Sequence, residues 1–342
     1  MALVTHRDPM VIGAALASWV EARGDAREVR VERAEHPSIG HSSETVLVDL
    51  ATATGDYRAE LVVRLAPATA GTFRDYDLEQ QTIAQTAAAA AGVPIAAPEL
   101  VTDRRWMDAE FVVMPRVRGH IVGEVAALDP WLLGLGVDER ARVYEAFVDA
   151  VATTHGADRA RAQGVPERDN AAELDFWADY LDWSSRGDPV RALADALEWC
   201  RIHRPASEPE PVLLWGDVRL GNVIFGDDLA PVAVLDWDMA SIGAPEHDVA
   251  WLTSLEMTTR TLLGQELGGF PDRDGTIALY ESCSGRALHD MTWYEVLATV
   301  RSTAIMTRIG YLHRDAGLPS PLPIDDNPLL DLLAARIAAA GG

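Results

Sequence analysis

Three polar residues, Asp217, Asn222 and Asp236, interrupt the apolar, strand-like runs between residues 212 and 252. PVLL ends just before WGD, NVIF begins at the asparagine, and VAVL ends just before the second aspartate. A carboxylate at a strand end, an amide five residues later and a second carboxylate after a hairpin can converge on one point. Two oxygen ligands suit a hard cation such as Mg²⁺, and a further carboxylate suits the orientation of a hydroxyl nucleophile. The set predicts phosphoryl transfer.

Each of the three residues also has a structural interpretation. Asp and Asn are common in turns because their side chains bond to nearby backbone groups. That interpretation suffices for one residue, but three at this spacing favour a site. Composition narrows the chemistry further, because the chain contains no lysine. Mechanisms that need a lysine, such as Schiff-base chemistry or a Walker-type phosphate loop, are therefore excluded.

The charge balance of the 342 residues limits the partners. There are 29 basic and 53 acidic residues, a net charge of −24. Nucleic acid and anionic membrane surfaces call for a basic face, so we expect neither as a partner. No apolar run of about 18 residues is present to cross a bilayer. Asp8 and Pro9 predict a helix start near the N-terminus rather than a secretion signal, so a cytoplasmic location is expected.

The elements that must position the three polar residues follow from hydrophobic spacing. Alternating Val and charge, then β-branched runs around the turn-like ATATGD, predict a β-sheet over residues 27–65. A helix is expected at 73–91 and a strand at 109–117. The remaining segments of helical spacing are 139–155, 172–183, 189–202, 245–258, 273–284, 289–315 and 327–340.

This order predicts an α+β fold with two domains. The N-terminal lobe, residues 1–116, is expected to be small and to contain an antiparallel sheet. The C-terminal lobe, residues 117–342, is expected to be larger and mainly helical. The two cysteines, Cys200 and Cys283, lie far apart and show no CxxC spacing, so the sequence suggests neither a disulfide framework nor a zinc site. Oligomeric state is not encoded in any pattern here.

The motif WGDVRLGN, together with AVLDWDMASIGAPEHDVAW, resembles the HGDxxxxN and LDWE-type motifs of the aminoglycoside phosphotransferase family. These are small-molecule kinases with a protein-kinase-like bilobal fold, and they include choline and homoserine kinases. VVRLAP is similar to the family's third strand, LEQQTIAQTAAAAAGVPIAAPELV to its helix C region, and FVVMPRVRGHIV to its interlobe hinge. The resemblance therefore extends over most of the chain.

The resemblance implies ATP and Mg²⁺ as cofactors and assigns roles to individual residues. Asp217 would be the catalytic aspartate that orients the acceptor hydroxyl or accepts its proton. Asn222 and Asp236 would bind Mg²⁺ on the ATP phosphates. Arg64 stands where many kinases have a phosphate-contacting lysine, and Glu79 where the helix C glutamate would pair with it. An arginine is a planar fork rather than a point charge, but it can still hold phosphate oxygens.

Further nucleotide contacts are implied by the N-terminal part. The loop SIGHSSET, residues 38–45, lies where kinases cover the phosphates with backbone amides, so Gly40 and Ser42 are expected near them. An ordinary hairpin loop is the alternative for this segment, because it has one glycine instead of three. Met114 and Arg116, in the strand that leads into the hinge, are expected to contact adenine through their backbone.

Several positions depart from the family pattern. Trp215 replaces the histidine of HGD, and an indole can only donate a hydrogen bond. Asp238 stands where a glutamate is usual, and metal contact and support of the metal ligands are both open for it. Asp248 is expected to anchor the following helix and loop rather than to contact the substrate. His155 and His247 are interpreted as structural because they lack metal-ligand spacing.

The acceptor is the least determined part. The segment FWADYLDW, residues 176–183, mixes aromatic and acidic side chains that would suit a cation, although its helical spacing favours a place in the core. We expect an ATP- and Mg²⁺-dependent kinase that phosphorylates a hydroxyl of a small molecule, either an aminoglycoside-like or a metabolic hydroxy compound. The alternative is a catalytically weak or inactive kinase-like protein that binds nucleotide and regulates.

Overall fold

The N-terminal sheet of the computed structural model is antiparallel and has the strand order β1-β2-β3-β5-β4. The structure describes residues 7–37, 44–188, 190–264, 266–324 and 327–341. The strands are β1 (Val29–Glu35), β2 (Glu44–Thr52), β3 (Arg58–Leu65), β4 (Glu99–Val101) and β5 (Phe111–Pro115). Along β2, buried and half-buried residues alternate, as expected for a strand with one face on a core. The expected sheet is confirmed.

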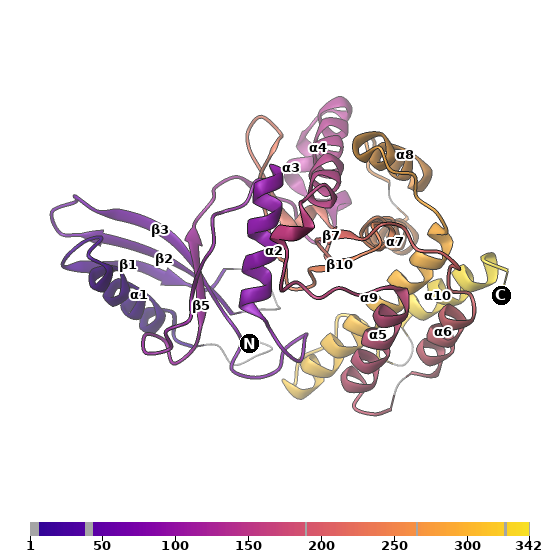
Figure 1. Ribbon diagram of the computed structural model, residues 1–342, viewed down its shortest axis with the longest axis horizontal. Coiled ribbons are helices and arrows are strands. Elements are labelled where there is room, and N and C mark those ends of the chain that lie inside the picture. Colours follow the sequence, from indigo (N-terminus) through magenta and orange to yellow (C-terminus); the bar gives the residue numbers. More distant parts are fainter. Residues whose placement is uncertain (1–6, 38–43, 189, 265, 325–326, 342) are drawn as a thin grey trace.

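Helix α1 (Pro9–Arg23) covers one face of this sheet (Figure 1). Its Asp8 N-cap accepts a hydrogen bond from the backbone of Met10, and Pro9 occupies the first turn, as predicted. The helix ends at Gly24, whose positive φ of 82° closes the last turn. Ile12 and Leu16 of the helix pack with the apolar face of the sheet into one core. This core lies apart from the catalytic motifs.

Helix α2 (Leu78–Ala91) stands between the sheet and the helical part (Figure 1). The alanine-rich face of α2 packs into the large C-terminal core through Ala84, Ala87 and Ala88. Small side chains allow this close approach of helix to core. The packing ties the N-terminal part firmly to the C-terminal part, although the boundary between residues 116 and 117 itself stays a prediction.

The rest of the described chain is mainly helical, as the sequence predicts. Its helices are α3 (Pro130–Gly134), α4 (Val137–His155), α5 (Asn170–Ser184), α6 (Arg191–Ile202), α7 (Glu246–Leu263), α8 (Arg273–Ser284), α9 (Met291–Asp315) and α10 (Pro328–Ala339). Short 3₁₀ turns are η1 (Ala126–Leu128), η2 (Arg159–Arg161) and η3 (Leu220–Asn222). Together with the sheet these elements confirm the α+β, kinase-like bilobal class.

Two small sheets carry the catalytic motifs. Strands β6 (His120–Ile121), β8 (Val223–Phe225) and β9 (Pro231–Val234) form one, and β7 (Val212–Leu214) pairs with β10 (Ser241–Gly243) in the other. All five strands are short, so packing on the surrounding helices rather than strand pairing must stabilise them. Trp215 and Trp237, both buried, anchor this region in the core.

The aromatic segment 176–183 mostly belongs to the core, as its spacing favoured. Trp177 and Tyr180 are buried, whereas Phe176 is exposed. Trp177 donates its indole N–H to the buried Glu173 at 2.8 Å, and the hydroxyl of Tyr180 donates to the backbone of Thr72 at 2.8 Å. These bonds satisfy the polar ends of otherwise apolar side chains.

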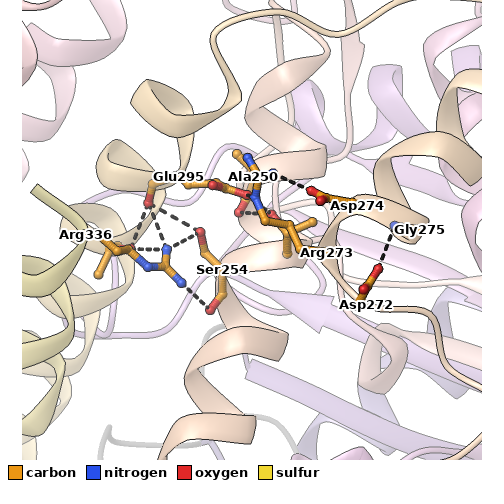
Figure 2. A network of polar contacts seen from close by, with 10 residues as sticks. Ala250, Ser254, Asp272, Arg273, Asp274, Gly275, Glu295 and Arg336 are labelled. Carbon is orange, nitrogen blue, oxygen red and sulfur yellow. Dashed lines mark hydrogen bonds and ion pairs between the residues drawn. The ribbon is translucent and has the colours of Figure 1, made fainter. Parts of the chain in front are cut away.

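A polar network fixes α7 against its neighbours. Figure 2 shows Arg336 of α10 directed at Ser254 of α7 and Glu295 of α9. Arg336 donates to the Ser254 hydroxyl at 2.6 Å and to the Glu295 backbone carbonyl at 3.1 Å. The Glu295 carboxylate in turn accepts from Arg273 at 2.7 Å. Helix α7 is therefore held on the side that faces α9 and α10.

Among the described residues, no helix has both the length and the apolar character needed to cross a membrane.

Candidate functional site

The three polar residues of the central motif come together at the ends of short strands. Asp217 follows β7, Asn222 closes the turn η3 before β8, and Asp236 follows β9. The backbone N–H of Leu235 donates to the carbonyl of Asn222 at 2.8 Å and so joins the two segments. The convergence expected from the sequence is therefore present in the backbone itself.

The carboxylate of Asp217 is held by three donors. Asn222 Nδ2 donates to Oδ2 at 2.7 Å, Arg219 Nε donates to the same oxygen at 3.1 Å, and Trp251 Nε1 donates to Oδ1 at 2.9 Å. Asn222 Nδ2 also reaches the Asp217 backbone carbonyl at 3.0 Å. A carboxylate with both oxygens fixed presents its remaining lone pairs in one direction, as the positioning of a reacting hydroxyl requires.

Two further carboxylates lie within electrostatic reach. Burial and the neighbouring charge of Asp238 raise the pKa of Asp236 to about 7, and Asp217 adds to the rise, while Arg64 and Arg219 oppose it. Like charges held close together disfavour ionisation in this way. The backbone of Asp236 is also unusual, with a φ of 56° at a residue that is not glycine. Such strain persists where the surrounding structure enforces it, and it is common at functional sites.

Arg64 links the N-terminal sheet to these carboxylates. From β3 it donates through Nη2 to Asp238 Oδ1 at 2.9 Å, and the same nitrogen is 3.9 Å from Asp236 Oδ1. Burial disfavours the charge of Arg64, but the two aspartates outweigh burial and raise its pKa. Arg64 thus reaches the site as expected, and the ion pair brings together two residues separated by 174 positions.

Glu79, the expected partner of Arg64, does not pair with Arg64 in the described structure. It is exposed in the first turn of α2. The salt bridges of Arg64 within the described chain go to Asp236 and Asp238, and none goes to Glu79. The next residue, Gln80, instead connects α2 to the site by donating from Nε2 to the carbonyl of Ala240 at 2.8 Å. The expected pair of arginine and glutamate is replaced by these two contacts.

Other N-terminal site residues are placed at the edge of β5. Met114 is buried, packs near Leu78 and pairs with Val62 of β3. The backbone N–H of Arg116 donates to the carbonyl of Glu60 at 2.9 Å, and bonded pairs alternate along an antiparallel ladder. The peptide groups of Met114 and Arg116 are therefore directed at β3 rather than at a ligand, which differs from the expected contacts with adenine. The guanidinium of Arg116 is engaged by Asp49 at 2.7 Å and by Glu60 at 3.0 Å. Gly40 and Ser42, predicted to lie over the phosphates, fall outside the residues that the structure describes.

Trp215 supports the site by bonding to the backbone that carries Asp236. Its indole N–H donates to the carbonyls of Leu235 at 2.8 Å and Asp236 at 3.1 Å. A donor-only indole therefore holds the backbone of the second motif, although it cannot reproduce the full hydrogen-bonding of a histidine. Trp215 therefore links the two motifs through these bonds.

Asp248 anchors the loop that carries Asp217, whereas the sequence suggested an anchor for the helix and loop that follow Asp248. Its carboxylate accepts from the backbone N–H groups of Trp215 at 2.8 Å and Gly216 at 2.9 Å. His155 lies 3.1 Å from the same carboxylate and is buried. Gly216 has a φ of 92°, and a Cβ there would meet the carbonyl oxygen of Met239 at 2.3 Å. Only glycine permits this close approach.

The second histidine, His247, is buried and structural as well. Its Nε2 lies 3.0 Å from Asn170 Oδ1, and Asn170 Nδ2 donates to the hydroxyl of Tyr294 at 2.9 Å. Burial lowers the pKa of His247 to about 4, so the ring is neutral at physiological pH. The interpretation of both histidines as structural is confirmed.

The residues present fit a hydrated divalent cation rather than a closed metal cage. Within the described ranges, no three His, Cys, Asp or Glu side chains form a metal-holding group. Asn222 uses its Nδ2 for Asp217, and its Oδ1 has no hydrogen-bond partner in the described chain. The buried Asp238 Oδ2 also lacks one. Mg²⁺ commonly takes one or two protein oxygens and completes its shell with phosphate and water.

Two site residues were missed by sequence reasoning. Trp251 and Arg219 hold the carboxylate of Asp217, but neither received a role from the motifs. Arg219 lies in GDVRLGN, two residues after Asp217. Trp251 lies in HDVAW, thirty-four residues after Asp217. Position in the motif was the available signal. The direction of their donors needs the three-dimensional structure.

Comparison with known proteins agrees with this geometry. The model of a family described as the phosphotransferase enzyme family matches residues 33–284. A curated relative, acyl-CoA dehydrogenase family member 11 of Homo sapiens, is 27% identical over 222 residues. The match covers 61% of this chain but 28% of that protein. The same relative in Gallus gallus is 28% identical over 229 residues, again 28% of its length. This chain therefore spans a minor part of those proteins.

Solved structures share the fold over nearly the full length. A provisionally assigned aminoglycoside phosphotransferase from Ralstonia eutropha JMP134 has a TM-score of 0.74 at 22% identity, covering 95% of this chain and 98% of the other. A choline/ethanolamine kinase family protein from Mesorhizobium loti has a TM-score of 0.55 at 16% identity, covering 96% and 94%. At these identities the likeness concerns the fold alone.

The raised pKa of Asp236 predicts a pH-dependent stability. Because its folded pKa of about 7 is above the ordinary value of 3.8, the unfolded chain ionises first, and stability is lost as pH rises through this interval. In metal-free buffer, Asp236→Asn should gain unfolding free energy relative to wild type between pH 5 and pH 8, by more than about 1 kcal/mol. Urea unfolding at the two pH values measures this difference.

The exposed Asp179 in α5 supplies the control. Asp179→Asn is expected to keep the same stability difference from wild type at both pH values. A pH-independent difference for Asp236→Asn as well would show that burial and the neighbouring carboxylates do not raise the pKa of Asp236 in the folded protein.

Proposed function

The chain belongs to the phosphotransferase enzyme family, and from this premise we propose that it transfers the terminal phosphoryl group of ATP, with Mg²⁺, to a hydroxyl group of a small molecule. One observation carries the proposal: the carboxylate of Asp217 is fixed by three donors beside a strained, electrostatically crowded Asp236. In this proposal residues 1–116 bind the nucleotide, and residues 117–342 supply catalysis and the acceptor site.

Asp217 is assigned the role of accepting the proton of the acceptor hydroxyl. Asn222 and Trp251 donate to its two different oxygens, so the carboxylate plane is set before the acceptor arrives. A hydroxyl that hydrogen-bonds to this carboxylate has its oxygen lone pair directed at the phosphoryl group and gives up its proton to Asp217 as the new bond forms. Arg219 compensates the negative charge during this step through its bond to the same carboxylate.

Asn222 Oδ1 and the carboxylate of Asp236 are assigned to Mg²⁺. The cation, when bound, neutralises the charge that develops on the phosphate oxygens. Its binding would also relieve the repulsion among Asp217, Asp236 and Asp238. Asp238 supports the site by holding Arg64 with one oxygen, and its other oxygen is free to assist the cation or its water shell.

Arg64 is assigned to the phosphates of the nucleotide. Its guanidinium lies against Asp236 and Asp238, where the phosphates would bind, and the planar fork of an arginine suits phosphate oxygens. The base would bind beside the end of β5, because β4 stops pairing opposite Val113 and leaves Pro115, the next residue that faces that side, without a partner there among the described strands. An aminoglycoside 2′-phosphotransferase with a similar fold was solved with GDP, so GTP belongs in the tests beside ATP.

The departures from the family motif do not favour the inactive alternative. Trp215 holds the backbone of Asp236, and Arg64 keeps an ion pair with Asp238. Both substitutions therefore preserve links within the site.

The name of the curated relatives refers to acyl-CoA dehydrogenase. Because the match covers 28% of their length, that name assigns no dehydrogenase activity to this chain.

The function is tested by acceptor-dependent ADP or GDP release in Mg²⁺, with aminoglycosides, choline, homoserine and aliphatic hydroxy compounds as acceptors. Asp217→Asn should reduce kcat with any accepted compound by at least about 100-fold, because the group that takes the proton is removed. Asp179→Asn, on an exposed helix face, should leave kcat unchanged. Turnover that survives in Asp217→Asn would contradict the assigned role, and absence of nucleotide binding would favour a non-catalytic protein.

Trp251→Phe tests how far orientation of Asp217 matters. The change removes one hydrogen bond to a carboxylate while keeping an aromatic ring, so kcat should fall about 10- to 100-fold with little change in the KM for nucleotide. Trp199→Phe is the matched control, because the buried indole N–H of Trp199 has no partner among the described residues. Equal kinetics in the two variants would remove Trp251 from the account.

A further inference from the structure

A cavity opens beside the arginine that holds Asp217. It encloses about 910 Å³ of empty space, its open mouth included. The walls come from residues 123–127, from residues 219–221, and from α7 with the segment that follows it up to Phe270. The polar network around Arg336 braces the opposite side of α7 (Figure 2). The cavity therefore has a fixed helix as one wall.

Arg219 connects the cavity to the carboxylate of Asp217. Arg219 lines it, and Arg219 Nε lies 3.1 Å from Asp217 Oδ2. The other end of the guanidinium donates from Nη1 to Glu124 Oε2 at 2.6 Å, and Glu124 lines the cavity as well. A molecule in the cavity thus lies within one side chain of the group assigned to the acceptor hydroxyl.

The walls are mostly apolar. The apolar lining residues are Ala126, Ala127, Leu220, Leu252, Leu255, Leu267 and Phe270. A concave site of this kind binds chiefly by removing apolar surface from water, while a few polar groups set orientation. The contrast is with a polycationic acceptor such as an aminoglycoside, which needs several carboxylates along its site.

The charged lining groups do not provide a negative field. Glu124 is paired with Arg219, and Arg260 donates to the carbonyl of Pro271 at 2.6 Å. Glu256 accepts from the hydroxyl of Tyr144 at 2.9 Å. Burial raises the pKa of Glu256 to about 7, so much of this carboxyl is neutral near physiological pH. With two acids balanced by two arginines, the cavity offers little to a multiply charged cation.

We propose that this cavity is the acceptor site and that the acceptor is a hydroxy compound with an apolar body, which lies between α7 and residues 123–127 while its hydroxyl reaches Asp217. The inference rests on the proposed phosphotransferase function and names the class of its acceptor. Glu256 contributes a polar contact inside the cavity, because its Oε1 has no hydrogen-bond partner in the described chain. In the transfer, the acceptor oxygen bonds to the terminal phosphorus of ATP while the bond from that phosphorus to the bridging oxygen breaks. A phosphate ester forms, ADP leaves, and the hydroxyl proton passes to Asp217.

The first test uses straight-chain primary alkanols from four to ten carbons as acceptors with ATP and Mg²⁺. Burial of each methylene is worth about 0.8 kcal/mol, which corresponds to a rise of about threefold to fourfold in kcat/KM per carbon until the cavity is filled. Aminoglycosides should give no turnover. A kcat/KM that is flat along the series, or preferred turnover of aminoglycosides, would overturn the assignment.

Two neighbouring substitutions in η1 locate the effect. Ala127 lines the cavity, whereas Leu128 is 53% exposed and does not. Ala127→Trp should fill the space and lower kcat/KM for 1-octanol by at least about tenfold, with nucleotide binding unchanged. Leu128→Trp should behave as wild type. Equal kinetics in the two variants would show that the acceptor lies elsewhere.

A binding measurement separates this inference from the proposed function. Calorimetric titration with 1-octanol, without nucleotide, should show binding to wild type and to Leu128→Trp, and at least about tenfold weaker binding to Ala127→Trp. If Ala127→Trp does not fold, Leu255→Ala replaces it, with Leu262→Ala on the exposed side of α7 as control. Octanol binding without any kinase activity would contradict the function alone, whereas kinase activity with no octanol binding would contradict the apolar acceptor alone.

Discussion

Repulsion among the carboxylates of Asp217, Asp236 and Asp238 is the constraint on which the site depends. Burial and, next to it, the charges of Asp238 and Asp217 raise the pKa of Asp236. Two arginines oppose it from different parts of the chain: Arg64 from the N-terminal sheet and Arg219 from the catalytic loop. The two arginines neutralise part of the charge of the three carboxylates. The negative charge that remains would stabilise a divalent cation that carries phosphate groups. In the proposed function, the acidic crowding costs free energy in the free protein and would favour the binding of Mg²⁺.

Backbone anchors keep these charges close together despite their repulsion. Asp248 holds the loop before Asp217 through two backbone N–H groups, and Trp215 holds the carbonyls around Asp236. Both anchors are buried, so the bonds gain from the absence of competing water. The strained φ of Asp236 is maintained by the same contacts. Rigid anchoring of the backbone by Asp248 and Trp215 explains how the carboxylates can present their oxygens in a common direction.

Local pattern was enough to predict the elements and the central motif, but not the partners across the chain. The convergence of Asp217, Asn222 and Asp236 follows from spacing in one short hairpin region. The bond between Arg64 and Asp238 joins positions 174 residues apart, and only the packing of the sheet on the helical part creates it. For the same reason Glu79 was expected beside Arg64, whereas the first turn of α2 leaves it exposed. The donor role of Trp251 depends on the rotation of α7, which spacing does not reveal.

The most direct test of the central claim is a crystal structure with Mg²⁺ and a non-hydrolysable ATP analogue. The account predicts a cation about 2.0–2.1 Å from Asn222 Oδ1 and from a carboxylate oxygen of Asp236, with phosphate oxygens completing its shell. It also predicts that Arg64 contacts the phosphates. A cation bound away from both residues, or a nucleotide bound with Asn222 and Asp236 free of metal, would contradict it.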